Sequence, residues 1–275
     1  MQQITYKFRN VLWYLRRPNF YPEFLQAARW QLFHASTAKT EQEAQSWAAE
    51  RAISTPEAIA NITGQPNPVP VRLAFADLFA VADRLARAAE DKLNRTPPFV
   101  PAGAANVDLL YWLAEHVQAR HIVETGVAYG WSSLAFLLSL KHRNNSLLIS
   151  SDMPFPGKDD DYVGCVVPEE LRSHWQLIAR PDREAVPKAL EQLRSIDICH
   201  YDSDKSYRGR MWAYALLWKA LRAGGCFISD DIGDNFAFRD FFDDLGVDYT
   251  IVHTMGRKKL KHVGIAIKPN RSRTE

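Results

Sequence analysis

Residues 121–152 restrict the folds open to this chain more than any other stretch. A short apolar segment, Ile122 and Val123, ends in an acid and is followed by a turn with two glycines and by an apolar helix that begins near Trp131. A second short apolar segment then ends at Asp152. This succession is typical of a βαβ unit, in which a ligand binds beyond the carboxyl ends of the strands. The glycines favour such a site because they let a ligand approach the backbone closely.

The same alternation of short apolar segments and helical patterns continues along the chain. The expected strands lie at 122–123, 147–151, 175–179, 196–201, 226–229, 247–253 and 263–267. The intervening helices predict a parallel sheet with helices on both faces. The last two strands are joined by too short a link for a parallel crossover and must therefore pair antiparallel. The fold class predicted is α/β, with a Rossmann-like seven-stranded sheet that is parallel except for an antiparallel C-terminal hairpin at its edge.

Residues 1–100 lack this alternation and are predicted to form a helical N-terminal extension, ahead of an α/β domain over residues 101–270. Thr40 and Glu43 have the spacing of a capping box, which predicts the start of a helix. From Val71 onward, apolar residues recur at helical spacing before a proline-rich link. The extension is expected to cover the substrate or to make contacts with a partner.

The first 35 residues are aromatic and basic, and two interpretations stay open for them. Such a helix can lie on a membrane surface, here the inner membrane face. It can equally pack on its own domain or across a homo-oligomer, and this second arrangement is the commoner one.

Composition excludes several classes of protein. The formal net charge of +2 argues against a nucleic-acid partner, because such proteins usually carry a strong basic excess. The three cysteines form no C-x-x-C pair, so they indicate neither a disulfide framework nor a zinc site. The N-terminus shows no signal-peptide pattern, and no run approaches the ~20 apolar residues of a membrane span. We therefore expect a cytoplasmic protein.

The turn after the first strand carries a recognisable motif. Its residues Glu124, Gly126, Gly130 and Ser132 follow the spacing E-x-G-x-x-x-G-x-S, which differs from the G-x-G-x-x-G of dinucleotide sites. This spacing resembles motif I of the class I S-adenosylmethionine-dependent methyltransferases, whose sheet also combines parallel strands with an antiparallel hairpin. The alternative is an ordinary α/β core in which the glycines serve only the turn.

The resemblance implies that S-adenosylmethionine is the cofactor. Glu124 and the glycine turn would hold its methionine end, and Asp152 would hold its ribose. By position in this fold class, Asp182 and Arg183 are candidates for adenine contacts, although Asp182 can equally be an N-cap of the following helix. The complete set of implied cofactor contacts is Glu124, Gly126, Gly130, Ser132, Asp152, Asp182, Arg183 and Asp202.

A second polar set follows the fourth and fifth strands. Asp202, Asp204 and Lys205 come after the fourth strand, and Asp230 and Asp231 come after the fifth. Because the carboxyl ends of parallel strands meet at one edge of a sheet, both groups should face the crevice of the first set. Three converging carboxylates are suited to Mg²⁺. The other interpretation is that these acids cap the helices that follow them.

This half of the chain resembles the metal-dependent O-methyltransferases, particularly the macrocin-type sugar O-methyltransferases, and is similar to the catechol and caffeoyl-coenzyme A enzymes. By that resemblance Asp202, Asp230 and Asp231 bind metal and Asp204 is the general base. In the catechol and caffeoyl-coenzyme A branch a lysine stands at the position of Lys205 and an asparagine at that of Asp231. The identity of the base, Asp204 or Lys205, therefore stays open.

The function implied is methyl transfer from S-adenosylmethionine to a hydroxyl of a small molecule, such as a sugar, a glycoconjugate or a natural product, with Mg²⁺ assisting. Two other functions stay open. An NAD(P)-dependent oxidoreductase would share the βαβ unit, although its G-x-G-x-x-G is missing here. A non-catalytic nucleotide-binding scaffold would use the N-terminal helices for assembly and keep the pocket as a relic.

Overall fold

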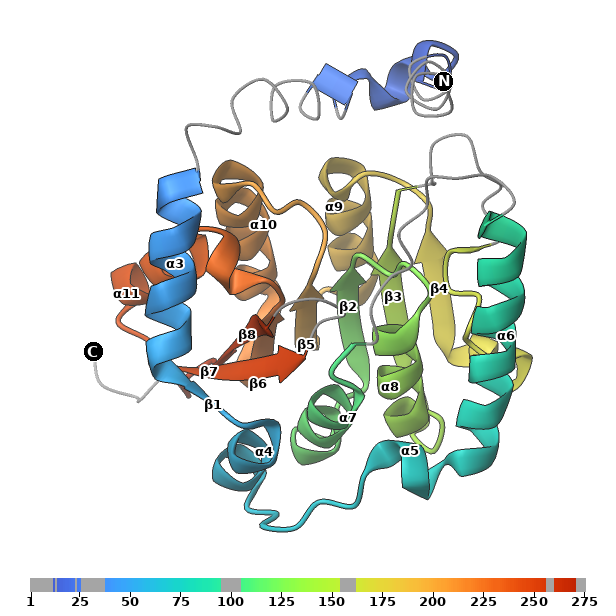
Figure 1. Ribbon diagram of the computed structural model, residues 1–275, viewed down its shortest axis with the longest axis horizontal. Helices are drawn as coiled ribbons and strands as arrows, with labels where there is room; N and C mark the ends of the chain where they lie inside the picture. Colours follow the sequence, from blue (N-terminus) through green and yellow to red (C-terminus); the bar gives the residue numbers. More distant parts are fainter. Residues whose placement is uncertain are drawn as a thin grey trace.

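A mostly parallel, eight-stranded sheet forms the centre of the computed structural model, which describes residues 12, 14–22, 24–25, 38–94, 105–153, 162–255 and 260–270 (Figure 1). The strands are β1 (Ala52–Ile53), β2 (His121–Thr125), β3 (Leu147–Ser151), β4 (Trp175–Ile178), β5 (Ile196–Tyr201), β6 (Leu221–Ser229), β7 (Tyr249–Met255) and β8 (Leu260–Ile267). Their order is β1-β7-β8-β6-β5-β2-β3-β4. Only the pairs made by β8 are antiparallel.

The predicted α/β fold with an antiparallel C-terminal hairpin is confirmed, with one difference in strand number. The sheet has an eighth strand, β1, which pairs parallel with β7 through Ala52 and Ile53. The hairpin is therefore not the outermost element at this edge of the sheet. Two residues between two helices are too few to show the alternation of a strand, so the sequence pattern could not predict β1.

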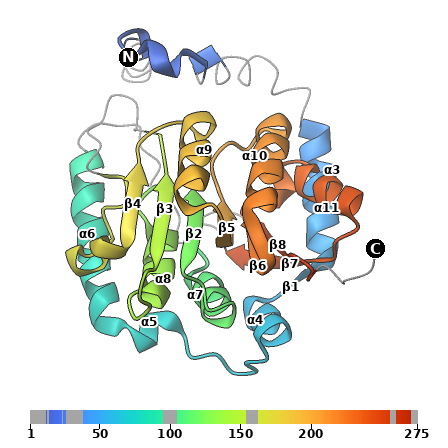
Figure 2. The same ribbon diagram turned by 180° about the vertical axis from the view of Figure 1, so that it is seen from behind.

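Helices cover both faces of the sheet. The described helices are α3 (Ala38–Arg51), α4 (Thr55–Thr63), α5 (Val71–Ala74), α6 (Ala76–Asn94), α7 (Val107–His116), α8 (Trp131–Leu140), α9 (Asp182–Leu193), α10 (Tyr207–Ala220) and α11 (Ala237–Leu245), with short 3₁₀ turns at η1 (Pro18–Phe20), η4 (Glu169–His174) and η5 (Ile232–Asp234). Figures 1 and 2 show α7 and α8 on one face and α9 and α10 on the other.

Strand residues alternate between two cores, because successive side chains of a strand point to opposite faces. Ile122 of β2 packs in the core formed with α7 and α8, whereas its neighbour Val123 packs in the core formed with α9 and α10. Cys226 and Phe227 of β6 divide in the same way. Burial on both faces explains why the parallel strands appear in the sequence as continuous apolar runs.

The helices before residue 100 share the core of the sheet. Ile59 of α4 and Phe79 of α6 are buried in the same cluster as residues of α7, α8 and β2. The division into an extension and a separate domain stays a prediction. Most of the aromatic, basic segment over the first 35 residues lies outside the described residues. In the described part of the chain, no helix has the length and apolar character needed to cross a bilayer.

Phe79 tests whether the N-terminal helices contribute to this core. Its ring is 2% exposed and stacks on Trp131 at the start of α8, with centroids 6.2 Å apart and planes 3° from parallel. We expect Phe79→Ala to lower the free energy of unfolding in urea by about 3–5 kcal/mol, because it removes a buried ring and leaves a cavity. Leu85→Ala, on the exposed side of the same helix, should lower it by less than about 1 kcal/mol. Equal losses would show that α6 lies outside the cooperative core.

Candidate active site

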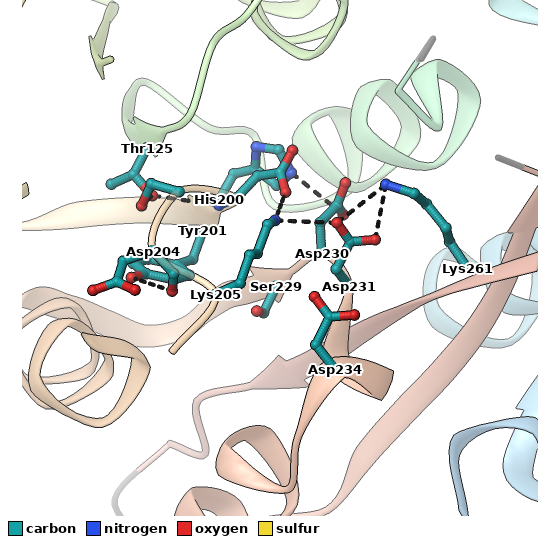
Figure 3. Close-up of polar contacts among 12 residues, drawn as sticks. Thr125, His200, Tyr201, Asp204, Lys205, Ser229, Asp230, Asp231, Asp234 and Lys261 are labelled. Atoms are coloured by element: carbon teal, nitrogen blue, oxygen red, sulfur yellow. Dashed lines mark hydrogen bonds and ion pairs between the residues drawn. The ribbon is translucent and has the colours of Figure 1, made fainter. Parts of the chain in front are cut away.

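The predicted site residues lie at or after the carboxyl ends of β2, β3, β4, β5 and β6. Figure 3 shows those that lie near the ends of β2, β5 and β6. Backbone hydrogen bonds hold three of these ends together. The amide of Asp202 donates to the carbonyl oxygen of Thr125 at the end of β2, and the amide of Asp230 donates to that of Tyr201 at the end of β5, both at 2.9 Å. The loops after β2, β5 and β6 therefore approach one another closely, as expected for the ends of parallel strands.

Glu124, on β2, is fully buried beneath the glycine turn. Its Oε2 accepts hydrogen bonds from the hydroxyls of Ser133 at 2.5 Å and Ser150 at 2.7 Å. Burial raises the pKa of this carboxyl, but the contacts with His200, Ser132 and Ser133 outweigh burial and leave the pKa below its usual value. Glu124 is thus a carboxylate that ties β2 to β3 and to the start of α8, directly under the turn.

The glycine turn is closed by Asp152. One oxygen of this carboxylate, Oδ2, accepts hydrogen bonds from the amides of Val127 at 2.9 Å and Ala128 at 2.6 Å. Burial raises the pKa of Asp152 to about 6, although these amide bonds act in the opposite direction. Gly130, with a φ of 94°, ends the turn and forms the N-cap of α8. Asp152 and the turn therefore form one unit, as expected for a βαβ ligand site.

Gly126 joins this unit to the loop after β5. It adopts a φ of 80°, and a Cβ atom at this position would collide with the backbone carbonyl of Asp202. The hydroxyl of Ser203, one residue further on, lies 2.9 Å from the hydroxyl of Thr125, within hydrogen-bond distance. The two predicted sets of residues, one around the turn and one at the ends of β5 and β6, are thus brought into backbone contact.

Asp182 and Arg183 lie at the start of α9 but make protein contacts. The carboxylate of Asp182 accepts hydrogen bonds from the hydroxyls of Ser203 and, at 3.4 Å, Tyr201. Asp182 is the first residue of α9, and the N-cap position is Pro181, so the N-cap interpretation of Asp182 is wrong. The guanidinium of Arg183 lies over the ring of Trp212, 5.6 Å from its centroid.

Asp204 belongs to the start of α10. Its Oδ1 accepts a hydrogen bond from the amide of Ser206 at 2.9 Å, and its carboxylate lies against Gly209 in the first turn of the helix. Ser206 itself is the N-cap and accepts from the amide of Gly209 at 3.0 Å. Figure 3 shows Asp204 on the far side of the site from Asp231. Asp204 is therefore bound to the start of α10 without being its N-cap, and this placement disfavours it as the general base.

Lys205 lies at the centre of the acidic set. Its ammonium group contacts Oδ1 of Asp202 and lies 3.2 Å from Oδ2 of Asp231. Burial lowers the pKa of Lys205, but the charges of the two carboxylates outweigh burial and raise it above the usual value. The side chain is therefore an ammonium ion at neutral pH, which disfavours Lys205 as a proton acceptor.

Lys261, on β8, reaches the same set from the other side. Its Nζ lies 2.9 Å from Oδ1 and 3.1 Å from Oδ2 of Asp231. Burial raises the pKa of Asp231, but Lys205 and Lys261 outweigh burial and bring the pKa to about 2. Asp231 adopts a φ of 55°, a left-handed conformation that is uncommon without a glycine.

His200 connects the two halves of the site. Its Nδ1 lies 3.5 Å from Oε1 of Glu124, and its Nε2 lies 3.6 Å from Oδ1 of Asp230. Burial lowers the pKa of the imidazole, but the two carboxylates outweigh burial and raise it to about 10. His200 is therefore a buried imidazolium between two acids.

Asp202, Asp230 and Asp231 are not arranged as metal ligands. A protonated side chain lies against each of their carboxylates, because Lys205 contacts Asp202 and Asp231 and His200 faces Asp230. Within the part of the chain that the structure describes, no group of three His, Cys, Asp or Glu residues could hold a metal ion. The predicted metal site is thus a cluster of ion pairs here.

His200 is a polar residue inside an apolar strand, a pattern that predicts a core or pocket-lining histidine, and the structure buries it. Sequence reasoning missed Lys261. This residue carries no local signal, because it lies on the second strand after Asp231, 30 residues further along the chain. Only the register of β8 beside β6, with Gly264 opposite Ser229, brings Lys261 to the site.

Comparisons with known proteins agree with this geometry. Residues 123–232 match a family model described as a methyltransferase domain. This segment runs from the strand before the glycine turn to the acids after β6. No match was found among curated proteins.

Solved structures share the fold at low sequence identity. An O-methyltransferase from Bacillus cereus in complex with SAH has 16% identity and a TM-score of 0.53, covering 69% of this chain and 91% of that chain. Cofactor-bound Rv0187 from MTB has 20% identity and a TM-score of 0.54, covering 75% and 100%. The O-methyltransferase TomG from Streptomyces achromogenes, involved in tomaymycin synthesis and in complex with SAM, has 19% identity and a TM-score of 0.51, covering 69% and 90%.

Residues 123–232 are therefore similar to a methyltransferase domain, and the solved structures share the fold of this chain. The match agrees with the methyltransferase resemblance of the glycine turn.

Substitutions at Gly126 and Gly64 test how closely the glycine turn approaches the loop after β5. Both have positive φ values, 80° and 74°, but only Gly126 lies against another backbone, since nothing lies within 4 Å of a Cβ atom at Gly64. We expect Gly64→Ala to lower the free energy of unfolding by about 1–2 kcal/mol through backbone strain alone. Gly126→Ala should lower it by about 1–3 kcal/mol more, because the loop after β5 must shift. Urea denaturation measures both values, and equal losses would contradict the close approach.

Proposed function

We propose that this protein is an S-adenosylmethionine-dependent methyltransferase that acts on a hydroxyl oxygen of a small molecule. The observation that carries the proposal is the contact between a methyltransferase glycine turn, closed by Asp152, and the polar loops after β5 and β6. The names of two similar structures, both O-methyltransferases, support an oxygen acceptor. Tomaymycin synthesis, named for one of them, supports an acceptor from the natural products, and sugars and glycoconjugates are proposed beside it.

The proposed cofactor contacts follow the turn. Gly126, Gly130 and Ser132 would lie along the methionine end of the cofactor, with Asp202 beside them. Glu124 would act through the turn that it supports, because its side chain is fully buried. Asp152 has one oxygen on the turn amides, which leaves its other oxygen for the ribose hydroxyls. Asp182 and Arg183, at the start of α9, are proposed to border the adenine.

Methyl transfer needs mainly correct positioning and removal of one proton. The acceptor oxygen attacks the methyl carbon, a C–O bond forms, and the C–S bond breaks, with its electrons going to sulfur. The hydroxyl proton goes to a carboxylate. Asp230 is proposed as this acceptor, since of the sequence candidates Asp204 is bound to the start of α10 and Lys205 is an ammonium ion. Among the described residues, Asp230 faces His200 and is paired with no lysine.

Mg²⁺ has no step in this proposal, because ammonium groups and not open ligand positions lie among the three acids.

The rival functions have less support. An oxidoreductase would need a dinucleotide turn that this chain lacks, and a scaffold would have no need for the paired acids and lysines at the strand ends. Four further points stay proposals. They are a cytoplasmic location, peripheral membrane contact through the first 35 residues, homo-oligomer formation and the absence of a nucleic-acid partner.

Cofactor binding is the first test. Titration calorimetry should show heat with S-adenosylmethionine and with S-adenosylhomocysteine and none with NADH. Asp152→Asn should weaken the affinity for both by about tenfold or more, because a hydrogen bond to a charged group contributes about 1.5–3 kcal/mol. Asp91→Asn, at an exposed position on α6, is the matched control and should bind normally.

The pH dependence of this affinity follows from the raised pKa of Asp152. The ionised carboxylate accepts ribose hydrogen bonds more strongly than the protonated carboxyl does, so the affinity should fall as the pH drops through about 6. The Asp152→Asn variant should show no such fall. Absence of heat with both methionine nucleosides would reject the function, and a fall of equal size in the variant would reject the role of Asp152.

Asp230→Asn tests the proposed proton acceptor. Turnover, followed as S-adenosylhomocysteine released with a panel of catechol, sugar and natural-product acceptors, should fall by about 10²–10⁴-fold. The affinity for S-adenosylmethionine should stay within about twofold, since Asp230 lies on the acceptor side. Asp244→Asn, on the surface of α11, should keep full turnover. Full turnover of Asp230→Asn would assign the proton to another group.

A further inference from the structure

We propose that the ammonium group of Lys205 takes the place among the strand-end acids that the sequence assigns to a divalent ion, so that the site is complete without metal. The inference deepens the proposed function by naming the cation of its acceptor side. It rests on the proposed function only where it concerns turnover. The ion pairs of Lys205 do not depend on that function.

The position of Lys205 supports the assignment. Its Nζ contacts Asp202, which follows β5, and lies 3.2 Å from Asp231, which follows β6. One cation thus bridges the two loops that would otherwise share a metal ion. A divalent ion between these two carboxylates would require the ammonium group of Lys205 to move away from them, since the two positive charges repel each other at such separations.

Lys261 makes the replacement more complete. Asp231 lies between Lys205 and Lys261, and each of its oxygens is within 3.2 Å of an ammonium group. Three strands, β5, β6 and β8, supply the groups of this cluster. Figure 3 shows both lysines converging on Asp231 from opposite sides. A second ammonium group at the same carboxylate opposes the binding of a metal ion there, because like charges repel.

Lys205 also has the chemistry to act on the acceptor. An ammonium group has three N–H donors, and two of them are directed at Asp202 and Asp231. The third can reach an acceptor oxygen that lies beside Asp230. A fixed positive donor there stabilises the negative charge that develops on the oxygen as its proton leaves. This is the effect that a bound metal ion would otherwise supply.

Metal titration distinguishes an acidic cluster that is closed by Lys205 from one that binds a divalent ion. The experiment titrates Mg²⁺ and Mn²⁺ by calorimetry into EDTA-dialysed full-length protein. Wild type should show no binding of either ion up to 10 mM. This concentration is about a hundredfold above the dissociation constant of a site that binds at about 0.1 mM, so such a site would be saturated. Lys205→Ala should gain binding with a dissociation constant of about 1 mM or tighter, because Asp202 loses its cation and Asp231 keeps only Lys261. Lys188→Ala, on the exposed side of α9, is the matched control and should resemble wild type.

Wild-type titration remains decisive if Lys205→Ala does not fold. Binding of Mg²⁺ or Mn²⁺ to the wild type at or below 10 mM, or tenfold stimulation of its turnover by either ion, would overturn the proposal. Failure of a folded Lys205→Ala variant to gain binding would also overturn it. Lys205→Arg keeps the positive charge and should remain insensitive to metal. Cofactor binding is measured separately with S-adenosylmethionine, so loss of the proposed function and loss of this inference give different results.

Discussion

The imidazolium of His200 is the interaction on which both halves of the site depend. It lies 3.5 Å from the carboxylate of Glu124 and 3.6 Å from that of Asp230, on three adjacent strands. A buried carboxylate is strongly unfavourable unless it is paired. Because one cation pairs both acids, the glycine turn above Glu124 and the loop after β6 are held by the same side chain. The glycine turn and the loop after β6 are therefore parts of one electrostatic unit.

The N-terminal helices support this unit from two directions. Phe79 of α6 stacks on Trp131, the first residue after the glycine turn. Gln45 of α3 lies against Gly233, two residues beyond Asp231. The segment that the sequence separates as an extension thus packs behind both loops of the site. Its sequence shows helices but not their partners, because packing contacts between distant segments leave no periodic pattern.

Sequence reasoning placed the right residues at the edge of the sheet but could not assign their contacts. Asp204 and Lys205 are neighbours, yet one turns to the start of α10 and the other to the acids. The three carboxylates after β5 and β6 indicate a magnesium site only if no cation of the chain pairs with them. Lys205 contacts Asp202 and Asp231, and Lys261 contacts Asp231, although nothing near Asp231 in the sequence predicts the contact with Lys261.

What the sequence determined by itself is local: the apolar strands and helices, the glycine turn and the acids where strands end. Each depends on residues adjacent in the chain, so composition and spacing record it. The tertiary structure alone decided that β1 joins the sheet, that Gly126 meets the backbone of Asp202 and that Lys205 and Lys261 share Asp231. These contacts depend on distances between separate segments, and the register of a folded sheet sets those distances.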